Sequence, residues 1–209
     1  MRASFGTLKL ALGLALACLA CAPARVEPRV WVDATSGIAA ALALDHEAGN
    51  EIFAPELGPT LDVAVWDDGT VVWSREGGSG ERTLLRGRVE PERVAAAVRA
   101  IAARIETVPS GERSYRVPDS GFDRIAVRGE RGWLELASAH EGFEQNPKLV
   151  ALDHGITAVD ERGRAAMLEE ASEGFRALRA AWADARRELE ALVPPTGEPC
   201  ESPPRASGG

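Results

Sequence analysis

A histidine beside a carboxylate recurs in this chain, and this pairing is the arrangement best suited to chemistry. The three histidines and their acidic neighbours are Asp45-His46, His140-Glu141 and Asp153-His154. Three imidazoles and one carboxylate form a ligand set for zinc. An imidazole held by a carboxylate can also act as a general base. The residue types therefore allow a metal site or an acid–base hydrolase built on His46, His140 and His154.

The spacing of these residues favours neither site. A zinc peptidase helix places its second histidine four residues after the first, but Asn50 and Glu144 stand at those positions. Neighbouring side chains diverge by about 100° on a helix and point to opposite faces of a strand. We therefore predict that neither Asp-His step forms a dyad by itself, with His46 at a helix end and His154 in a loop. The metal-dependent or acid–base hydrolase is kept as the alternative.

Other catalytic motifs match less well. Ser79 lies in a glycine-rich stretch in which Glu81 replaces the second glycine of a nucleophile elbow. The step from Asp67 to Gly69 lacks the further oxygen ligands of a calcium loop. The chain has no phosphate-binding loop and no dinucleotide fingerprint. The sequence therefore predicts no cofactor.

Tryptophans form the second candidate site, because the chain has five of them and one tyrosine. Trp66, Trp73 and Trp133 lie in two expected hairpins. An exposed aromatic surface on these hairpins would bind a glycan or a peptide. The alternative is that helices cover these side chains, which is the commoner use of tryptophan.

A first hairpin is expected over residues 61–73. An Asp-Gly step between β-branched residues is a strong signal for a two-residue turn. Such a turn pairs Trp66 with Val71 and places Trp66 and Trp73 on the same face of the hairpin. Both faces are then apolar, and both need cover.

A second hairpin is expected over residues 122–136. Pairing Val127 with Leu134, and Ile125 with Leu136, gives one apolar face. The other face then carries the polar residues Arg124, Arg128 and Glu135. This alternation predicts a hairpin with one side in contact with solvent.

Three segments have helical periodicity. We expect helices over residues 35–48 and from Pro91 to the residue before Pro109. An apolar stripe with spacings of three and four runs through residues 163–192, formed by Leu168, Ala171, Phe175, Leu178, Trp182, Ala185, Leu189 and Leu192. We expect this long helix to lie across the sheet with a kink or break near Gly174. The alternative is a dimer through the 163–192 helix.

The order of these elements predicts an α+β fold, with an antiparallel sheet built from two hairpins, helices on one face and a long C-terminal helix. We expect one globular domain over residues 31–193. A signal peptide at 1–20 and a tether at 21–30 precede it. A proline-rich tail at 194–209 follows it and is expected to be disordered, because proline removes backbone donors and fixes φ.

The beginning of the chain has the pattern of a secretory leader. Arg2 and Lys9 precede an apolar run of about a dozen residues, which is shorter than the roughly 20 that a membrane-spanning helix needs. The run ends in Leu19-Ala20-Cys21, which resembles the lipobox of bacterial lipoprotein precursors.

The lipobox resemblance covers about a tenth of the chain and implies that a cysteine is lipidated and becomes the new N-terminus. Cys21 is the expected lipidation site and Cys18 the alternative. The sequence departs from the family pattern where Cys18 stands in place of the preferred leucine. Acyl chains on the cysteine would hold the protein at a membrane. Cleavage near Ala20 or Ala22 without lipidation would instead release a soluble secreted or periplasmic protein.

The chain is acidic, with a formal net charge of −8, which becomes −10 when Arg2 and Lys9 leave with the leader. This charge argues against nucleic-acid binding. Loss of Cys18 and lipidation of Cys21 would leave Cys200 alone, so we expect no internal disulfide. The sequence thus predicts an exported lipoprotein of the cell envelope that binds an envelope protein, peptide or glycan, or has a structural role, without catalysis.

Overall fold

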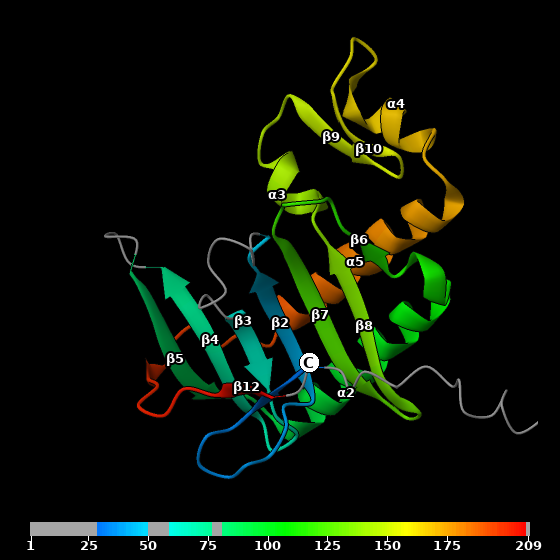
Figure 1. Ribbon diagram of the computed structural model, residues 1–209. Coiled ribbons are helices and arrows are strands. Elements are labelled where there is room, and N and C mark those ends of the chain that lie inside the picture. Colours follow the sequence, from blue (N-terminus) through cyan, green and yellow to red (C-terminus); the bar gives the residue numbers. More distant parts are fainter. Residues whose placement is uncertain (1–28, 50–58, 77–80, 208–209) are drawn as a thin grey trace, which may run out of the picture. The chain divides into compact units, whose positions relative to one another are not determined.

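The computed structural model describes residues 29–49, 59–76 and 81–207 (Figure 1). Its main element is an eight-stranded sheet in this part of the chain, antiparallel except for one parallel pair at an edge. The strands in order across the sheet are β11 (Glu198–Pro199), β5 (Arg82–Arg88), β4 (Thr70–Glu76), β3 (Thr60–Val65), β2 (Leu42–Glu47), β7 (Phe122–Gly129), β8 (Gly132–Ser138) and β6 (Ser114–Tyr115).

Two small ribbons and several helices complete the described part. The ribbons are β1 (Val30–Val32) with β12 (Arg205–Ser207), and β9 (Leu149–Leu152) with β10 (Gly155–Ala158). The helices are α2 (Pro91–Thr107), α3 (His140–Glu144), α4 (Gly163–Glu169), α5 (Glu173–Glu190) and the short 3₁₀ turn η1 (Ser110–Glu112). This mixed content and the mainly antiparallel sheet confirm the α+β class.

The second hairpin has the predicted register. In β7 and β8, Val127 pairs with Leu134 and Ile125 with Leu136. Ile125, Val127 and Leu136 are fully buried on the apolar face. Regular alternation and a short turn were therefore sufficient to predict this pairing.

The first hairpin is shifted by one residue from its predicted register. Trp66 and Thr70 close a three-residue loop, with the Trp66 amide donating to the Thr70 carbonyl at 2.9 Å. Gly69 has φ +85° in this loop, a conformation that glycine adopts without strain. Trp73 consequently pairs with Val63 rather than with Ala64. The prediction that Trp66 and Trp73 share a face is wrong, because the shift places them on opposite faces.

The predicted helix over residues 35–48 is also wrong. Asp33 accepts hydrogen bonds from the backbone amides of Thr35 and Ser36 at 3.0 and 2.8 Å, which fixes a turn where the helix was expected to begin. The following residues form β2, a central strand between β3 and β7. Apolar side chains are needed on both faces of a central strand, so its alanines and leucines resembled a helix in the sequence.

One face of the sheet is covered by α2 and α5 (Figure 1). The main core lies between these helices and the sheet. The helices contribute Val94, Ile101 and Ile105 of α2 with Leu178 and Trp182 of α5. The predicted break near Gly174 is present, since α4 ends at Glu169 and α5 begins at Glu173. The Ser172 hydroxyl caps α5 by accepting from the Phe175 amide at 3.2 Å. The apolar stripe of α5 is thus buried within one chain, and a dimer through this helix stays a prediction.

The other face of the sheet has a smaller apolar cluster and a buried ion pair. The cluster contains Trp31, Ala43, Ala64, Trp66 and Val72, among others. Beside it, Asp45 is 0% exposed and accepts hydrogen bonds from the guanidinium of Arg124 at 2.6 and 3.1 Å and from the Trp31 indole at 2.6 Å. Arg124 also donates to Glu135 at 2.9 Å. Arg124 was expected on a solvent-facing side, but it is buried and donates to the carbonyl of Arg29, just before β1, at 2.9 Å.

The proline-rich tail differs from its prediction. Glu198 and Pro199 pair with β5 and form an edge of the sheet, where proline is tolerated because its missing donor faces away from the ladder. Residues 205–207 pair with β1. Arg29–Ser207 therefore forms one compact unit that includes most of the segment predicted to be disordered. The predicted signal peptide, the expected lipidation site Cys21 with its alternative Cys18, and residues 21–28 of the tether lie outside the described residues.

None of the helices in the described ranges combines the length and the apolar character needed to cross a bilayer.

Candidate functional site

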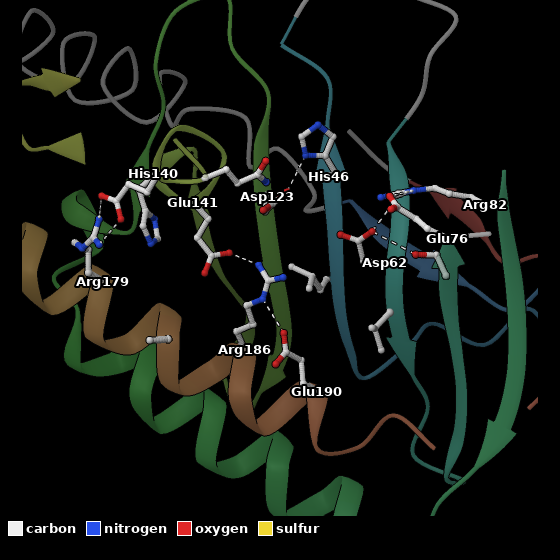
Figure 2. Close-up of a pocket in the computed structure, with 16 residues that line it drawn as sticks. His46, Asp62, Glu76, Arg82, Asp123, His140, Glu141, Arg179, Arg186 and Glu190 are labelled. Carbon is white, nitrogen blue, oxygen red and sulfur yellow. Dashed lines mark hydrogen bonds and ion pairs between the residues drawn. The ribbon is translucent and has the colours of Figure 1, made fainter. Parts of the chain in front are cut away.

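An open cleft of about 960 Å³ lies between α3 and α5 on one side and strands β2, β3, β4 and β7 on the other (Figure 2). It is on the face of the sheet that the helices cover, at the end where β2 finishes. Polar side chains line most of it, and the apolar side chains of Leu44, Val63 and Ala183 complete it. This cleft is the candidate functional site, because it gathers charged groups from several elements that are distant in sequence.

His46 and Asp123 form a hydrogen-bonded pair in the cleft. They are direct neighbours in the β2–β7 register, and Nδ1 of His46 lies 2.7 Å from Oδ1 of Asp123. The imidazole is 44% exposed. Gly121 packs against its other side, where an added Cβ would lie 2.9 Å from Nε2. The ring is thus held by a carboxylate and a tight backbone contact, with part of its surface open to solvent.

Asp62 anchors the strand side of the cleft. The β2–β3 register shifts between Leu44 and Asp45, and Asp62 is the extra residue at this bulge. Its carboxylate lies 3.2 Å from the Arg82 guanidinium, which is also 3.8 Å from Glu76. Burial raises the pKa of Asp62, and the negative charge of Asp123 adds to that rise against the opposing effect of Arg82.

Two ion pairs between α3 and α5 form the helical side. Glu144 accepts two hydrogen bonds from Arg179, both at 2.8 Å. Burial alone would raise the pKa of Glu144, but these bonds and the Ala151 amide outweigh it and lower the pKa. Arg186 contacts Glu141 and donates to Glu190 at 2.8 Å (Figure 2). These pairs hold the short helix α3 against α5.

His140 is the buried histidine of the cleft. Its Nδ1 lies 2.5 Å from the Ser138 hydroxyl, and its ring meets Trp182 edge to face with centroids 5.9 Å apart. Burial, together with the positive charge of Arg179, lowers the pKa of His140 to about 4. The imidazole is therefore neutral at physiological pH. This fits a packed and hydrogen-bonded role rather than that of a free proton carrier.

The structure brings two of the three predicted histidines into one cleft and leaves the third outside it. His154 is 73% exposed in the turn between β9 and β10. Its Nδ1 lies 3.0 Å from its neighbour Asp153, so the prediction that neither Asp-His step pairs is wrong for this one. Among the described residues, no three histidine, cysteine or acidic side chains are grouped as metal ligands. The three-histidine zinc arrangement is therefore not formed in this part of the chain.

The predicted tryptophan surface is not formed either. Trp66 and Trp73 are both buried, on opposite faces of the sheet, and the Trp66 indole donates to the Ile38 carbonyl at 2.9 Å. Trp133 is partly exposed on β8 and lies apart from both. The alternative prediction of covered tryptophans holds for Trp66 and Trp73, although β1 rather than a long helix helps to cover Trp66.

Sequence reasoning missed most of the cleft. Asp62, Asp123, Arg179 and Arg186 were not singled out, because each meets its partner only through strand pairing or helix packing. His46 and Asp123 are 77 positions apart. Assigning residues 42–47 to a strand would have been the signal that found this pair, since pairing with β7 then places Asp123 beside His46.

Comparison with models of known protein families, with curated proteins and with solved structures finds no match to this chain.

Proposed function

We propose that this protein is an exported, lipid-anchored protein of the cell envelope that binds a small polar ligand in the cleft without transforming it. The observation that carries the binding proposal is the cleft itself, with its volume of about 960 Å³ and its lining of charged side chains from both sheet and helices. The leader and its resemblance to a lipobox support the envelope location.

The pairing of the charged groups favours binding over catalysis. Most of the ionised side chains in the cleft already contact a group of opposite charge, and His140 is neutral and buried. Among the described residues, the hydrogen bond of His46 goes to Asp123 and not to a hydroxyl or thiol nucleophile. Side chains that hold one another in place in this way can orient a polar ligand.

Binding is tested by filling the cleft. Ala183 is an exposed residue of α5 that lines the cleft, so Ala183→Trp would occupy the cleft without disturbing the core. Ala180→Trp, exposed on the same helix but outside the lining, is the matched control. Saturation-transfer NMR with a panel of amino acids, amines, sugars and carboxylic acids should find ligands that Ala183→Trp loses and Ala180→Trp keeps. A panel without such a ligand contradicts the binding proposal.

Anchoring is tested by the cysteines. Intact mass of the membrane-extracted protein should show acyl chains on a chain that begins at Cys21. Cys21→Ser should remove them and release the protein from membranes, whereas Cys18→Ser should leave both unchanged. The reverse pattern would assign the lipid to Cys18, and an unmodified mature chain would contradict anchoring.

The His46–Asp123 pair favours a second candidate, an acid–base hydrolase with His46 as general base. An imidazole that is oriented by a carboxylate and open to solvent can take a proton from water. Chromogenic ester and peptide substrates test this candidate. Hydrolysis that His46→Gln removes and His154→Gln retains would support it, and equal background rates for wild type and both variants would reject it.

A further inference from the structure

The cleft has more carboxylates than its basic groups neutralise. Six carboxylates line it against three guanidiniums. His140 adds no charge near neutral pH. The lining therefore has a formal charge of −3 with both imidazoles neutral, or −2 when His46 is protonated. A cleft with this balance attracts cations and repels anions.

Two of the surplus charges lie at separate places, and the third is that of Asp123, which contacts His46. On the helical side, Arg186 is shared between Glu141 and Glu190; on the strand side, Arg82 is shared between Asp62 and Glu76. Figure 2 shows each guanidinium beside its two carboxylates. One guanidinium offsets one of two negative charges, so each place retains about one, together with carboxylate lone pairs that can accept further hydrogen bonds.

Apolar side chains also contribute to the lining of the cleft. Leu44 and Val63 are paired neighbours on β2 and β3, and both contribute to the cleft. A ligand that reaches both groups can therefore contact methyl groups as well as polar atoms. This favours a ligand whose charged ends are joined by a hydrocarbon chain.

We infer that the ligand of this cleft is an aliphatic amine with two separated ammonium groups. One ammonium binds the carboxylates of Glu141 and Glu190, and the other binds those of Asp62 and Glu76. The methylene chain between them packs on Leu44 and Val63. The inference rests on the proposed function, because it names the chemical class of ligand for the same cleft.

Isothermal titration calorimetry with 1,5-diaminopentane as the probe tests this inference on the mature chain. A series of α,ω-diamines gives the chain length that fits best. Pentylamine, 1,5-pentanediol and glutarate keep the five-carbon chain while changing its charge. We expect the diamine to bind more tightly than the monoamine, and we expect no binding of the diol or of glutarate. Affinity should fall with added salt, since solvent-exposed charges are screened.

The variant that tests the site combines Asp62→Asn with Glu190→Gln, which removes one carboxylate from each anionic group. We expect the affinity for the diamine to fall by about tenfold for each carboxylate, the range for hydrogen bonds to charged groups. The matched control combines Glu106→Gln with Glu170→Gln. It removes the same charge from exposed ion pairs outside the cleft and should leave affinity nearly unchanged.

The possible results separate this inference from the proposed function. Failure of every diamine to bind overturns the inference. Equal weakening in the cleft and control variants also overturns it, because the attraction would then be unspecific. If glutarate or the diol binds instead and Ala183→Trp abolishes that binding, the cleft is a binding site but the ligand class is wrong. If Ala183→Trp has no effect on any ligand, the proposed function itself fails.

Discussion

Charged clusters lie on both faces of the sheet, and they differ in how completely they are closed. On one face, Asp45 and Arg124 are buried. The two carboxylate oxygens of Asp45 both accept hydrogen bonds, which come from Arg124 and Trp31. On the other face, the carboxylates of the cleft outnumber their basic partners, and most of them are partly exposed to solvent. A closed network positions a strand, whereas an open network with surplus charge can bind a ligand. How far each cluster is closed, rather than its residue types, separates the structural cluster from the proposed binding site.

The largest expected effect comes from breaking the closed cluster. Asp45→Ala leaves the Arg124 guanidinium buried with one carboxylate fewer, and it should lower the free energy of unfolding by about 3–5 kcal/mol. Urea denaturation measures this loss. The double change Asp45→Leu with Arg124→Met removes both charges and should recover much of it. A loss below about 1 kcal/mol for Asp45→Ala would show that water reaches the pair.

The tryptophans give the next largest difference. Trp66 is 4% exposed in the smaller apolar cluster, so Trp66→Ala should cost about 3 kcal/mol or more. Trp133→Ala, at a partly exposed position, should cost about 1 kcal/mol or less. Denaturant midpoints of the two variants test the ranking. Equal losses would contradict the assignment of Trp66 to a core beneath β1.

The free energy of unfolding should depend on pH through His140, the buried histidine of the cleft. Its pKa is about 4 in the folded protein against 6.5 in the unfolded chain. Folding therefore favours the neutral ring, so its contribution is complete above pH 6.5 and is lost as the pH falls towards 4. The loss is about 3 kcal/mol at most.

Unfolding free energies of wild type and His140→Gln between pH 7 and pH 4 isolate this effect. The difference between the two should shrink as the pH falls, because the variant cannot titrate at this position. Parallel curves would show that His140 titrates normally and is not desolvated.

The smallest effect is expected for the exposed pair of Glu106 with Arg131. Arg131 is 88% exposed and the pair spans 3.1 Å. Glu106→Gln should change the free energy of unfolding by about 0.5 kcal/mol or less. This result, measured by urea denaturation, also establishes Glu106 as a suitable control position. A change of more than about 1 kcal/mol would disqualify it.

The parts of the fold that follow local rules were predictable, and those that follow from long-range pairing were not. The β7–β8 hairpin was found because alternation and a short turn fix its register. The helix α2 was found because Pro91 and regular apolar spacing mark its beginning and its buried side. In contrast, β2 looks helical in the sequence, because its two buried faces leave no alternation of apolar and polar residues.

The candidate site was predicted only in part for the same reason. His46 and His140 were singled out by residue type, but their partners Asp123 and Ser138 were not. Asp62 is placed by a bulge, and Arg186 meets Glu141 through helix packing. None of these contacts has a local sequence signal. The register of the first hairpin was missed by one residue, and that error placed Trp66 and Trp73 on one face in the expected tryptophan surface.

The antiparallel pairing of β1 with β12 places Val30 directly beside Ser207. A short designed linker could therefore join these positions and close the chain into a ring. New ends opened at the exposed turn between Gly129 and Gly132 would give a circular permutant with the same sheet order. In such a permutant, β12 and β1 would be consecutive strands and would form an ordinary internal hairpin.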